Sequence, residues 1–191
     1  MNCYKTRRAG SWVIAWLSIL FICTLAAPAQ RKYRISATAM GTSYQLGRIV
    51  SVDFHMNSYS TPADKSALLE AFMEDGSEGL ANALDKMSSK GRMAITGTLG
   101  FDINYIRLFN MPDGGQMLRF ITDRPIRFGE HWASTRSMDY QISIGEIIMP
   151  KGKGKVTGTL IPAARIKLNK EKEIEIEAYQ NPWKLTNIKI W

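Results

Sequence analysis

The stretch Arg48-Ile49-Val50-Ser51-Val52-Asp53-Phe54-His55-Met56-Asn57 decides the fold class of this chain. Apolar side chains occupy every second position of it, namely Val50, Val52, Phe54 and Met56, and polar side chains lie between them. Because successive side chains of a strand point to opposite faces, this alternation predicts a half-buried β-strand. The preceding segment, Tyr33–Leu46, is expected to supply another strand.

Strand patterns return after Arg92 and continue to the end of the chain. Pro112-Asp113-Gly114 predicts a tight hairpin between Asp102–Asn110 and Met117–Asp123, because proline presets φ and glycine accepts the left-handed conformation. Lys151-Gly152-Lys153-Gly154-Lys155 separates two further strand candidates in the same way. The remaining strand candidates are Ser137–Met149, Lys155–Ala163, Arg165–Asn169, Glu173–Tyr179 and Lys184–Ile190.

Charge predicts how two of these strands pair. If Leu168 lies opposite Ile174, then Lys167 lies opposite Glu175, and Arg165 lies opposite Glu177. Apolar then meets apolar and base meets acid, which stabilises a cross-strand pairing. We therefore expect residues 167–177 to be a solvated hairpin face with a structural role.

A helical segment interrupts the strands at about residues 62–88. Thr61 is a good helix cap, Pro62 suits the first helical position, and Asp64 places negative charge near the N-terminus. Asp75-Gly76-Ser77 breaks the pattern, so we expect a helical hairpin of two short helices lying on the sheet. Their apolar sides are Leu68, Leu69, Phe72 and Met73 in the first helix, and Leu80, Leu84 and Met87 in the second.

These patterns together predict an α+β fold. We expect a mostly antiparallel, curved or barrel-like sheet of seven to nine strands, with a pair of short helices inserted after the second or third strand.

The first 29 residues have the layout of a secretory signal peptide. Met1–Gly10 is basic, Trp12–Leu25 is a nearly unbroken apolar run, and Ala27-Pro28-Ala29 is a cleavage-like signal. We expect export across the inner membrane and a periplasmic or secreted product that is a single β-rich domain, residues 30–191. The apolar run is shorter than the roughly 20 residues that a membrane-spanning helix needs, so no membrane span is expected after cleavage.

Cleavage changes the composition of the working chain. Cys3 and Cys23 both leave with the signal, so the mature chain has neither disulfides nor thiolate chemistry. Three basic residues and no acidic one leave as well, which lowers the net charge from +8 to +5. Because these charges are interspersed, they favour solubility, and we expect no nucleic-acid partner.

Six short motifs form a recognisable set along the chain. They are Tyr59-Ser60-Thr61-Pro62, Leu99-Gly100-Phe101-Asp102, Asp113-Gly114-Gly115, Thr122-Asp123-Arg124-Pro125-Ile126, Arg136-Ser137-Met138-Asp139-Tyr140 and Ile144-Gly145-Glu146-Ile147. With them the chain resembles a family of uncharacterised secreted bacterial proteins, and it departs from that family at Gly129, where an aromatic residue is common. The resemblance covers most of the chain and implies a single domain behind a signal peptide, with no known activity, cofactor or partner.

Residues suited to catalysis are few. Asp53 and His55 lie two apart on the polar face of the first predicted strand, close enough to converge on a proton or a metal ion. A mixed site with Glu130 and His131 requires residues 124–136 to fold back onto that strand. We favour the alternative, an exposed strand face, and expect no metal and no other cofactor. The chain also lacks the Gly-x-Ser-x-Gly, His-Glu-x-x-His and phosphate-loop motifs.

Glu146 interrupts an apolar strand face. Continuing the face of Ile144 buries Glu146, which is costly for a carboxylate without a partner. We expect a β-bulge at Gly145 that turns Glu146 outward. The alternative is burial of Glu146 against an arginine such as Arg107 or Arg119, or with a raised pKa and a catalytic role.

The segment Asp123–Arg136 is the longest stretch without strand or helix periodicity. It concentrates the residues that we expect to bind a ligand, namely Arg124, Arg127, Glu130, His131, Trp132 and Arg136. Long irregular segments are often binding loops, and arginines beside tryptophan suit carboxylate, phosphate or sugar recognition. The alternative is a crossover whose arginines cap strand ends and pair with Asp123 and Asp139.

Three functions follow from these features. The first is a non-enzymatic binding protein that takes a small ligand or a protein partner through residues 124–136 or a cavity of the curved sheet. The second is a hydrolase-like enzyme that uses Asp53 and His55 with Glu130 or Glu146. The third is a structural envelope component. We expect the first.

Overall fold

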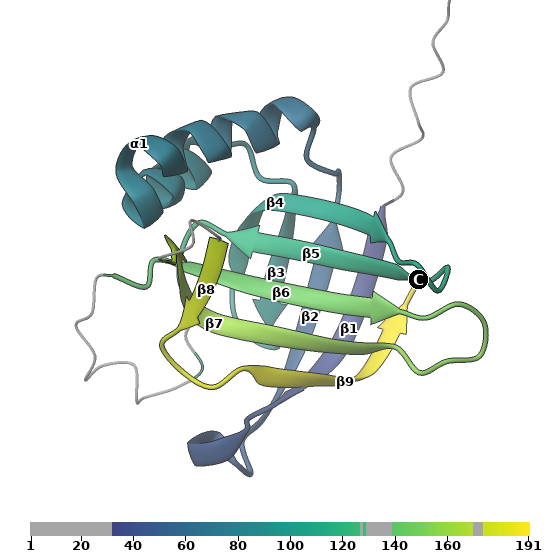
Figure 1. Ribbon diagram of the computed structural model, residues 1–191. Helices are drawn as coiled ribbons and strands as arrows, with labels where there is room; N and C mark the ends of the chain where they lie inside the picture. Colours follow the sequence, from purple (N-terminus) through teal and green to yellow (C-terminus); the bar gives the residue numbers. More distant parts are fainter. Residues whose placement is uncertain (1–31, 127, 129–138, 170–173) are drawn as a thin grey trace, which may run out of the picture.

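The computed structural model describes residues 32–126, 128, 139–169 and 174–191, which form one nine-stranded antiparallel sheet (Figure 1). Its strands are β1 (Tyr33–Met40), β2 (Ile49–Met56), β3 (Gly91–Ile95), β4 (Phe101–Asn110), β5 (Gln116–Thr122), β6 (Ile142–Met149), β7 (Thr157–Leu168), β8 (Ile174–Ala178) and β9 (Trp183–Ile190). Their order is β6-β5-β4-β3-β2-β1-β9-β7-β8, and β6 also pairs with β7. Eight strands therefore close into a barrel, and β8 is added outside it. The predicted β-rich α+β fold is confirmed, while the predicted signal peptide lies outside the described residues.

The helical segment is a single element, α1 (Pro62–Lys86). The prediction of two short helices is not confirmed, although Asp75 and Gly76 have non-helical backbone angles inside α1. Gly76 has a φ of 62°, a conformation that glycine adopts without steric cost, which explains a kink at this position. None of the helices in the described part of the chain is long and apolar enough to cross a membrane.

The N-terminus of α1 is capped as predicted. The Thr61 hydroxyl accepts a hydrogen bond from the Asp64 backbone N–H at 3.1 Å, and the Asp64 carboxylate accepts one from the Thr61 backbone N–H at 2.7 Å. Lys90 lies 3.3 Å from the same carboxylate. Burial alone raises the pKa of Asp64, but the hydrogen bonds from Thr61 and Lys90 outweigh it and hold this pKa below its usual value.

One side of α1 covers the outer face of β4, β5, β6 and β7. Its buried side chains pack there against apolar side chains of these strands, in a cluster that contains Leu68, Phe72, Leu80, Ala81, Leu84, Tyr105, Ile142, Ile144 and Ala164. The predicted apolar stripe was too wide, because Leu69 is 41% exposed and Met73 is 71% exposed. A helix rotates about 100° per residue, which turns these two positions away from the sheet.

The barrel interior is packed with apolar side chains. Alternate residues of the barrel strands face inward, and the largest fully buried ones are Trp183, Phe54, Phe120, Ile35, Met56, Met93, Ile103, Ile106 and Leu118. The predicted inward face of β2 is confirmed, since Val52, Phe54 and Met56 are buried in this core.

The predicted hairpins are confirmed with one change. The turn after Asn110 closes with a hydrogen bond from the Gly114 backbone N–H to the Met111 carbonyl at 2.9 Å. The candidates Lys155–Ala163 and Arg165–Asn169 are one strand, β7, rather than two. The register between β7 and β8 is the one that charge predicts, with Lys167 opposite Glu175 and Arg165 opposite Glu177.

Candidate functional site

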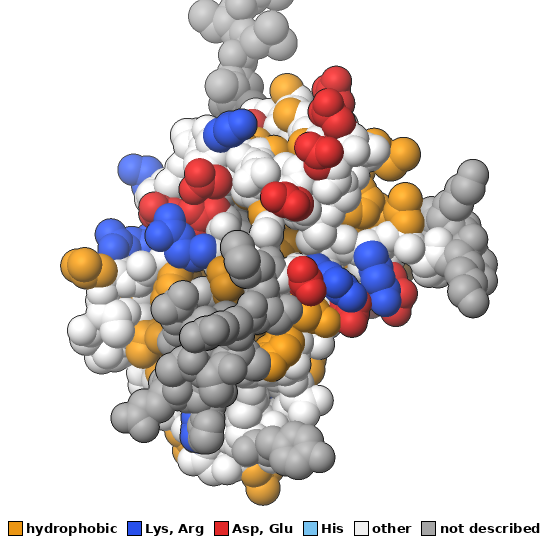
Figure 2. Space-filling view, turned by 90° about the vertical axis from the view of Figure 1, so that its left-hand side faces the viewer, with side chains coloured by type: hydrophobic (Ala, Val, Ile, Leu, Met, Phe, Trp, Pro, Cys, Tyr) orange, Lys and Arg blue, Asp and Glu red, His pale blue; other side chains and the backbone are white. Residues whose placement is uncertain are grey.

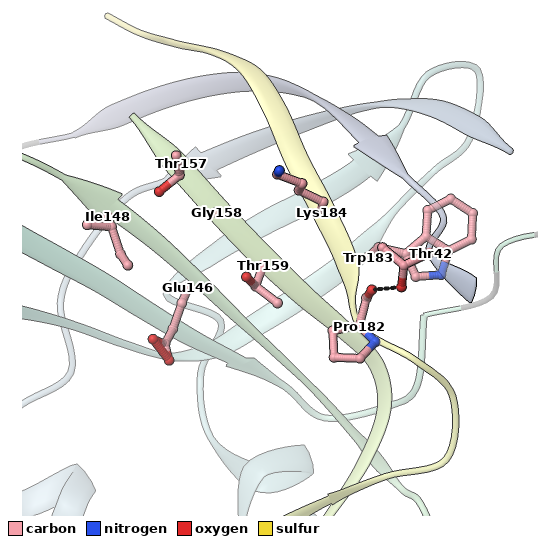
Figure 3. Close-up of a pocket in the computed structure, with 9 residues that line it drawn as sticks. All are labelled: Thr42, Glu146, Ile148, Thr157, Gly158, Thr159, Pro182, Trp183 and Lys184. Atoms are coloured by element: carbon pink, nitrogen blue, oxygen red, sulfur yellow. Dashed lines mark hydrogen bonds between the residues drawn. The ribbon is translucent and has the colours of Figure 1, made fainter. Parts of the chain in front are cut away.

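An open groove lies on the outer face of the barrel, where β6, β7 and β9 are neighbours (Figure 3). Its volume is about 480 Å³. The groove is lined by Thr42, Glu146, Ile148, Thr157, Gly158, Thr159, Pro182, Trp183 and Lys184.

Strand alternation explains why the polar residues of the groove face outward. Gly158 and Leu160 of β7 are buried, so Thr157 and Thr159, which alternate with them, project from the barrel. Thr159 lies opposite Glu146 on β6 and opposite Lys184 on β9. A carboxylate, a hydroxyl and an ammonium group therefore form one row across three strands. The Cα atoms of Glu146 and Lys184 are separated by two strand spacings, or about 10 Å.

One end of the groove is closed by the β1–β2 connection. The Thr42 hydroxyl donates a hydrogen bond to the Pro182 carbonyl at 2.7 Å, as Figure 3 shows. Behind Pro182, the Trp183 ring is buried and stacks on Phe128 with 4.3 Å between ring centroids. The rigid aromatic pair supports the backbone that lines this end of the groove.

Glu146 reaches the groove without the predicted bulge at Gly145. The pairing of β5 with β6 runs without a shift from Gln116 to Thr122, so Glu146 shares the outer face of Ile144. Gly145 is needed for another reason, because a Cβ at this position would overlap the ring of Phe120, its cross-strand partner inside the barrel. The bulge prediction is therefore wrong, since Gly145 accommodates an aromatic ring and does not redirect the strand.

The carboxylate of Glu146 is paired with Arg119, one of the two arginines considered from the sequence. Arg119 donates from Nε at 3.2 Å and from Nη2 at 3.0 Å to Glu146 Oε2. The Glu146 side chain is 31% exposed and that of Arg119 is 37% exposed, so this is a surface pair and not a buried one. Arg119 also lies over the ring of Phe109, 5.6 Å from its centroid, which fixes the guanidinium.

Asp53 and His55 lie elsewhere on the barrel. Both are on the outward-facing side of β2, and His55 has Arg34 of β1 and Arg92 of β3 as its cross-strand neighbours. In the sheet order β2 is four strands from β6 in either direction, so the barrel wall separates His55 from Glu146. Among the described residues, no group of three histidine, cysteine or acidic side chains is placed to hold a metal ion.

Of the predicted binding loop, the structure describes its beginning. Arg124 forms a two-pronged ion pair with Asp123, at 3.0 Å from Nε and 2.8 Å from Nη2, as the structural alternative predicted. The hydrogen bonds and charge of Asp123 raise the pKa of Arg124 above its usual value. The other predicted ligand-binding residues, Arg127, Glu130, His131, Trp132 and Arg136, lie outside the described residues.

Three groove residues, Thr157, Thr159 and Lys184, were not predicted from the sequence, and neither was the pairing of β9 with β7. The alternation of β7 around Gly158 and Leu160 is a signal for the outward threonines. Nothing in the local pattern indicates that β9 lies beside β7, because Lys184 is distant from Thr159 along the chain.

No family model matches the chain, and searches of curated proteins and of solved structures also find no match.

Proposed function

We propose that this is an exported, non-enzymatic binding protein that holds a small acidic polyol, such as a sugar acid, in the groove over β6, β7 and β9. The proposal keeps the class of function expected from the sequence and moves the contact from residues 124–136 to the outer face of the barrel.

The observation that carries this proposal is the free ammonium group of Lys184 beside two free hydroxyls. Within the described part of the chain, Lys184 has no ion pair, and the Thr157 and Thr159 hydroxyls form no hydrogen bond. Figure 3 shows the Lys184 side chain on the β7 side of strand β9. An unpaired cation with adjacent hydroxyls suits a ligand that carries one negative charge and several hydroxyl groups.

The other side of the groove supports the same class of ligand. The Glu146 carboxylate is held by Arg119 through one oxygen, Oε2, and its Oε1 has no hydrogen-bond donor in the described part of the chain. A carboxylate oxygen accepts hydrogen bonds from sugar hydroxyls. Since Glu146 and Lys184 flank Thr159 on the two neighbouring strands, a ligand that lies over β7 has an acceptor on one side and an ammonium group on the other.

The test is an NMR titration of the domain with glucuronate, using glucose as the uncharged control ligand. We expect glucuronate to shift the backbone amides of residues 157–159 and 184, and glucose to shift them far less. Lys184→Gln is expected to weaken glucuronate binding about tenfold, because a charge-assisted hydrogen bond is lost. Lys189→Gln, on the same strand and outside the groove, is the matched control and is expected to bind as the unmodified protein does.

Two results would contradict the proposal. One is the absence of amide shifts in the groove at saturating glucuronate. The other is equal binding by the Lys184→Gln variant. Native mass spectrometry of the protein purified from its own periplasm then identifies the ligand that accompanies it.

A further inference from the structure

Charge is divided between two sides of this molecule. Residues 62–86 of α1 hold six acidic and two basic side chains, whereas strands β9, β1, β2 and β3 hold four basic side chains and one acidic one. Figure 2 shows acidic side chains gathered over α1 at the top of the molecule. Since α1 covers β4 to β7, the outer face of β9, β1, β2 and β3 lies on the other side of the barrel.

That other side presents a row of cationic and aromatic groups. Trp191 and Arg34 exchange two backbone hydrogen bonds of 3.0 Å, Arg34 lies opposite His55, and His55 lies opposite Arg92. Cross-strand neighbours have Cβ atoms about 5 Å apart, so the row is continuous. We call the outward side chains of Arg34, His55, Arg92, Lys189 and Trp191 the basic face.

The two arginines of the basic face, Arg34 and Arg92, form no ion pair with the described part of the sheet, although Asp53 shares their side of the barrel and Asp102 lies opposite Arg92. Arg34 of β1 and Arg92 of β3 flank His55 of β2, so the two guanidinium groups lie on one face with no carboxylate between them in the row. The row is therefore available to an external negative charge.

An exposed aromatic side chain in the row indicates the kind of anionic partner. Trp191 is 60% exposed and pairs with Arg34 through backbone hydrogen bonds. Tryptophan with arginine and lysine is the composition of proteins that lie on a bilayer surface, where the ring sits at the headgroup level and the cations meet lipid phosphates. The outer face of a barrel is convex, so it touches a flat surface more readily than it enters a nucleic-acid groove.

We propose that the basic face docks the domain on an anionic lipid surface, with Arg34 and Arg92 at the headgroup phosphates and Trp191 in the interfacial layer. The inference does not depend on the groove, because the residues of the two sites are different.

The experiment is sedimentation of the domain with vesicles of equal parts phosphatidylglycerol and phosphatidylcholine, compared with vesicles of phosphatidylcholine alone. We expect binding to the anionic vesicles, weakened by added salt, and little binding to the neutral ones. Arg34→Gln combined with Arg92→Gln is expected to weaken binding about 30-fold. Each cation near an anionic surface contributes roughly a five- to sixfold gain in affinity, and the variant removes two of them. Lys65→Gln combined with Lys86→Gln removes the same charge from α1 and is expected to leave binding unchanged.

Several outcomes would overturn the proposal. These are the absence of binding to anionic vesicles, equal binding by the Arg34 and Arg92 double variant, and tighter binding to a short DNA duplex than to the vesicles. Circular dichroism confirms that each variant is folded. Lys184→Gln, which tests the groove, is expected to bind vesicles normally, so failure of one proposal is distinguishable from failure of the other.

Discussion

Gly145 shows how one side chain determines its neighbour in this barrel. The Phe120 ring lies where a Cβ of residue 145 would be, and tilts against Phe54 with 5.1 Å between ring centroids. We expect Gly145→Ala to lower the free energy of unfolding by about 2 kcal/mol through overpacking. Urea unfolding measures the change, and Gly145→Ala combined with Phe120→Leu is expected to recover part of the loss. An unchanged urea midpoint in the single variant would show that the ring moves away freely.

Glu146 gives a second prediction for a single residue. Because its ion pair with Arg119 is about one third exposed, Glu146→Gln is expected to lower the free energy of unfolding by at most about 1 kcal/mol. Breaking a buried ion pair would cost about 3–5 kcal/mol instead. Urea unfolding of Glu146→Gln and of the surface control Glu175→Gln distinguishes the two cases, and a loss in the higher range would contradict the surface description.

For Glu146, the sequence predicts the face of the strand correctly but not the exposure of the side chain. Alternation correctly puts Glu146 on the face of Ile142 and Ile144. Alternation does not show how far along β6 the helix α1 covers that face. Ile142 and Ile144 lie beneath α1, whereas Glu146 lies beyond it, in the groove. The Glu146 carboxylate, which the apolar residues beside it in the sequence suggest is buried, is therefore at the surface.

The β7–β8 hairpin is the element that charge specifies most directly. Glu177 accepts hydrogen bonds from the Tyr140 hydroxyl at 2.9 Å and Arg165 Nε at 2.9 Å, and Lys167 Nζ lies 3.2 Å away. The hydrogen bond from Tyr140, followed by those from Arg165 and Lys167, lowers the pKa of Glu177 from 4.5 to about 2.

This shift predicts how pH affects the hairpin. Because the pKa is lower in the folded chain, ionised Glu177 stabilises the fold above about pH 4.5, and the contribution is lost as pH falls from 4.5 toward 2. We expect Glu177→Gln to reduce the loss of stability over that range, measured as the urea midpoint, whereas Glu175→Gln changes it less. NMR titration of the Glu177 carboxyl is expected to show a higher pKa in Tyr140→Phe, and an unchanged pKa would contradict the assignment of Tyr140 as the main cause.

Helix α1 begins at a capping box, which gives a prediction for that element. Thr61→Ala removes the acceptor for the Asp64 backbone N–H and is expected to lower the free energy of unfolding by about 1 kcal/mol. Thr61→Ser keeps the acceptor and is expected to be close to neutral. Ser66→Ala is the control within the helix, since the Ser66 hydroxyl bonds the Pro62 carbonyl and not a helix-end donor. Thermal unfolding in which Thr61→Ala and Ser66→Ala behave alike would contradict a role for the cap.

Sequence predicts these elements better than it predicts their assembly. The alternation of β2, the turn after Asn110 and the charges of the β7–β8 hairpin are local signals, and the structure confirms each of them. Closure of the barrel depends on pairings of β1 with β9 and of β6 with β7. The β1–β9 pair joins segments about 150 residues apart in the sequence, and no local sequence pattern predicts that they are neighbours. The groove was missed for the same reason, since its third wall is β9.

At the scale of the whole molecule, the barrel presents three different surfaces. One side of the wall is covered by the acidic helix α1, the β6–β7–β9 side carries the groove, and the β9–β1–β2–β3 side carries the basic face. The packed interior of large apolar side chains keeps these surfaces rigid relative to one another. The groove residue Lys184 and the basic-face residues Lys189 and Trp191 lie toward opposite ends of β9, so the proposed ligand and the proposed lipid contact are compatible in one molecule.

Export of the domain is the prediction that concerns the whole chain. The first strand of the barrel starts at Tyr33, so cleavage after Ala29 leaves every described strand intact. When the full chain is expressed in a bacterium, we expect the periplasmic product to begin at Gln30, as measured by its intact mass. Ala29→Leu places a bulky residue at the cleavage site and is expected to accumulate the precursor, whereas Ala26→Leu, outside the small-x-small signal, is expected to be processed normally. A full-length product in the cytoplasm, or processing of Ala29→Leu at the normal rate, would contradict the signal peptide.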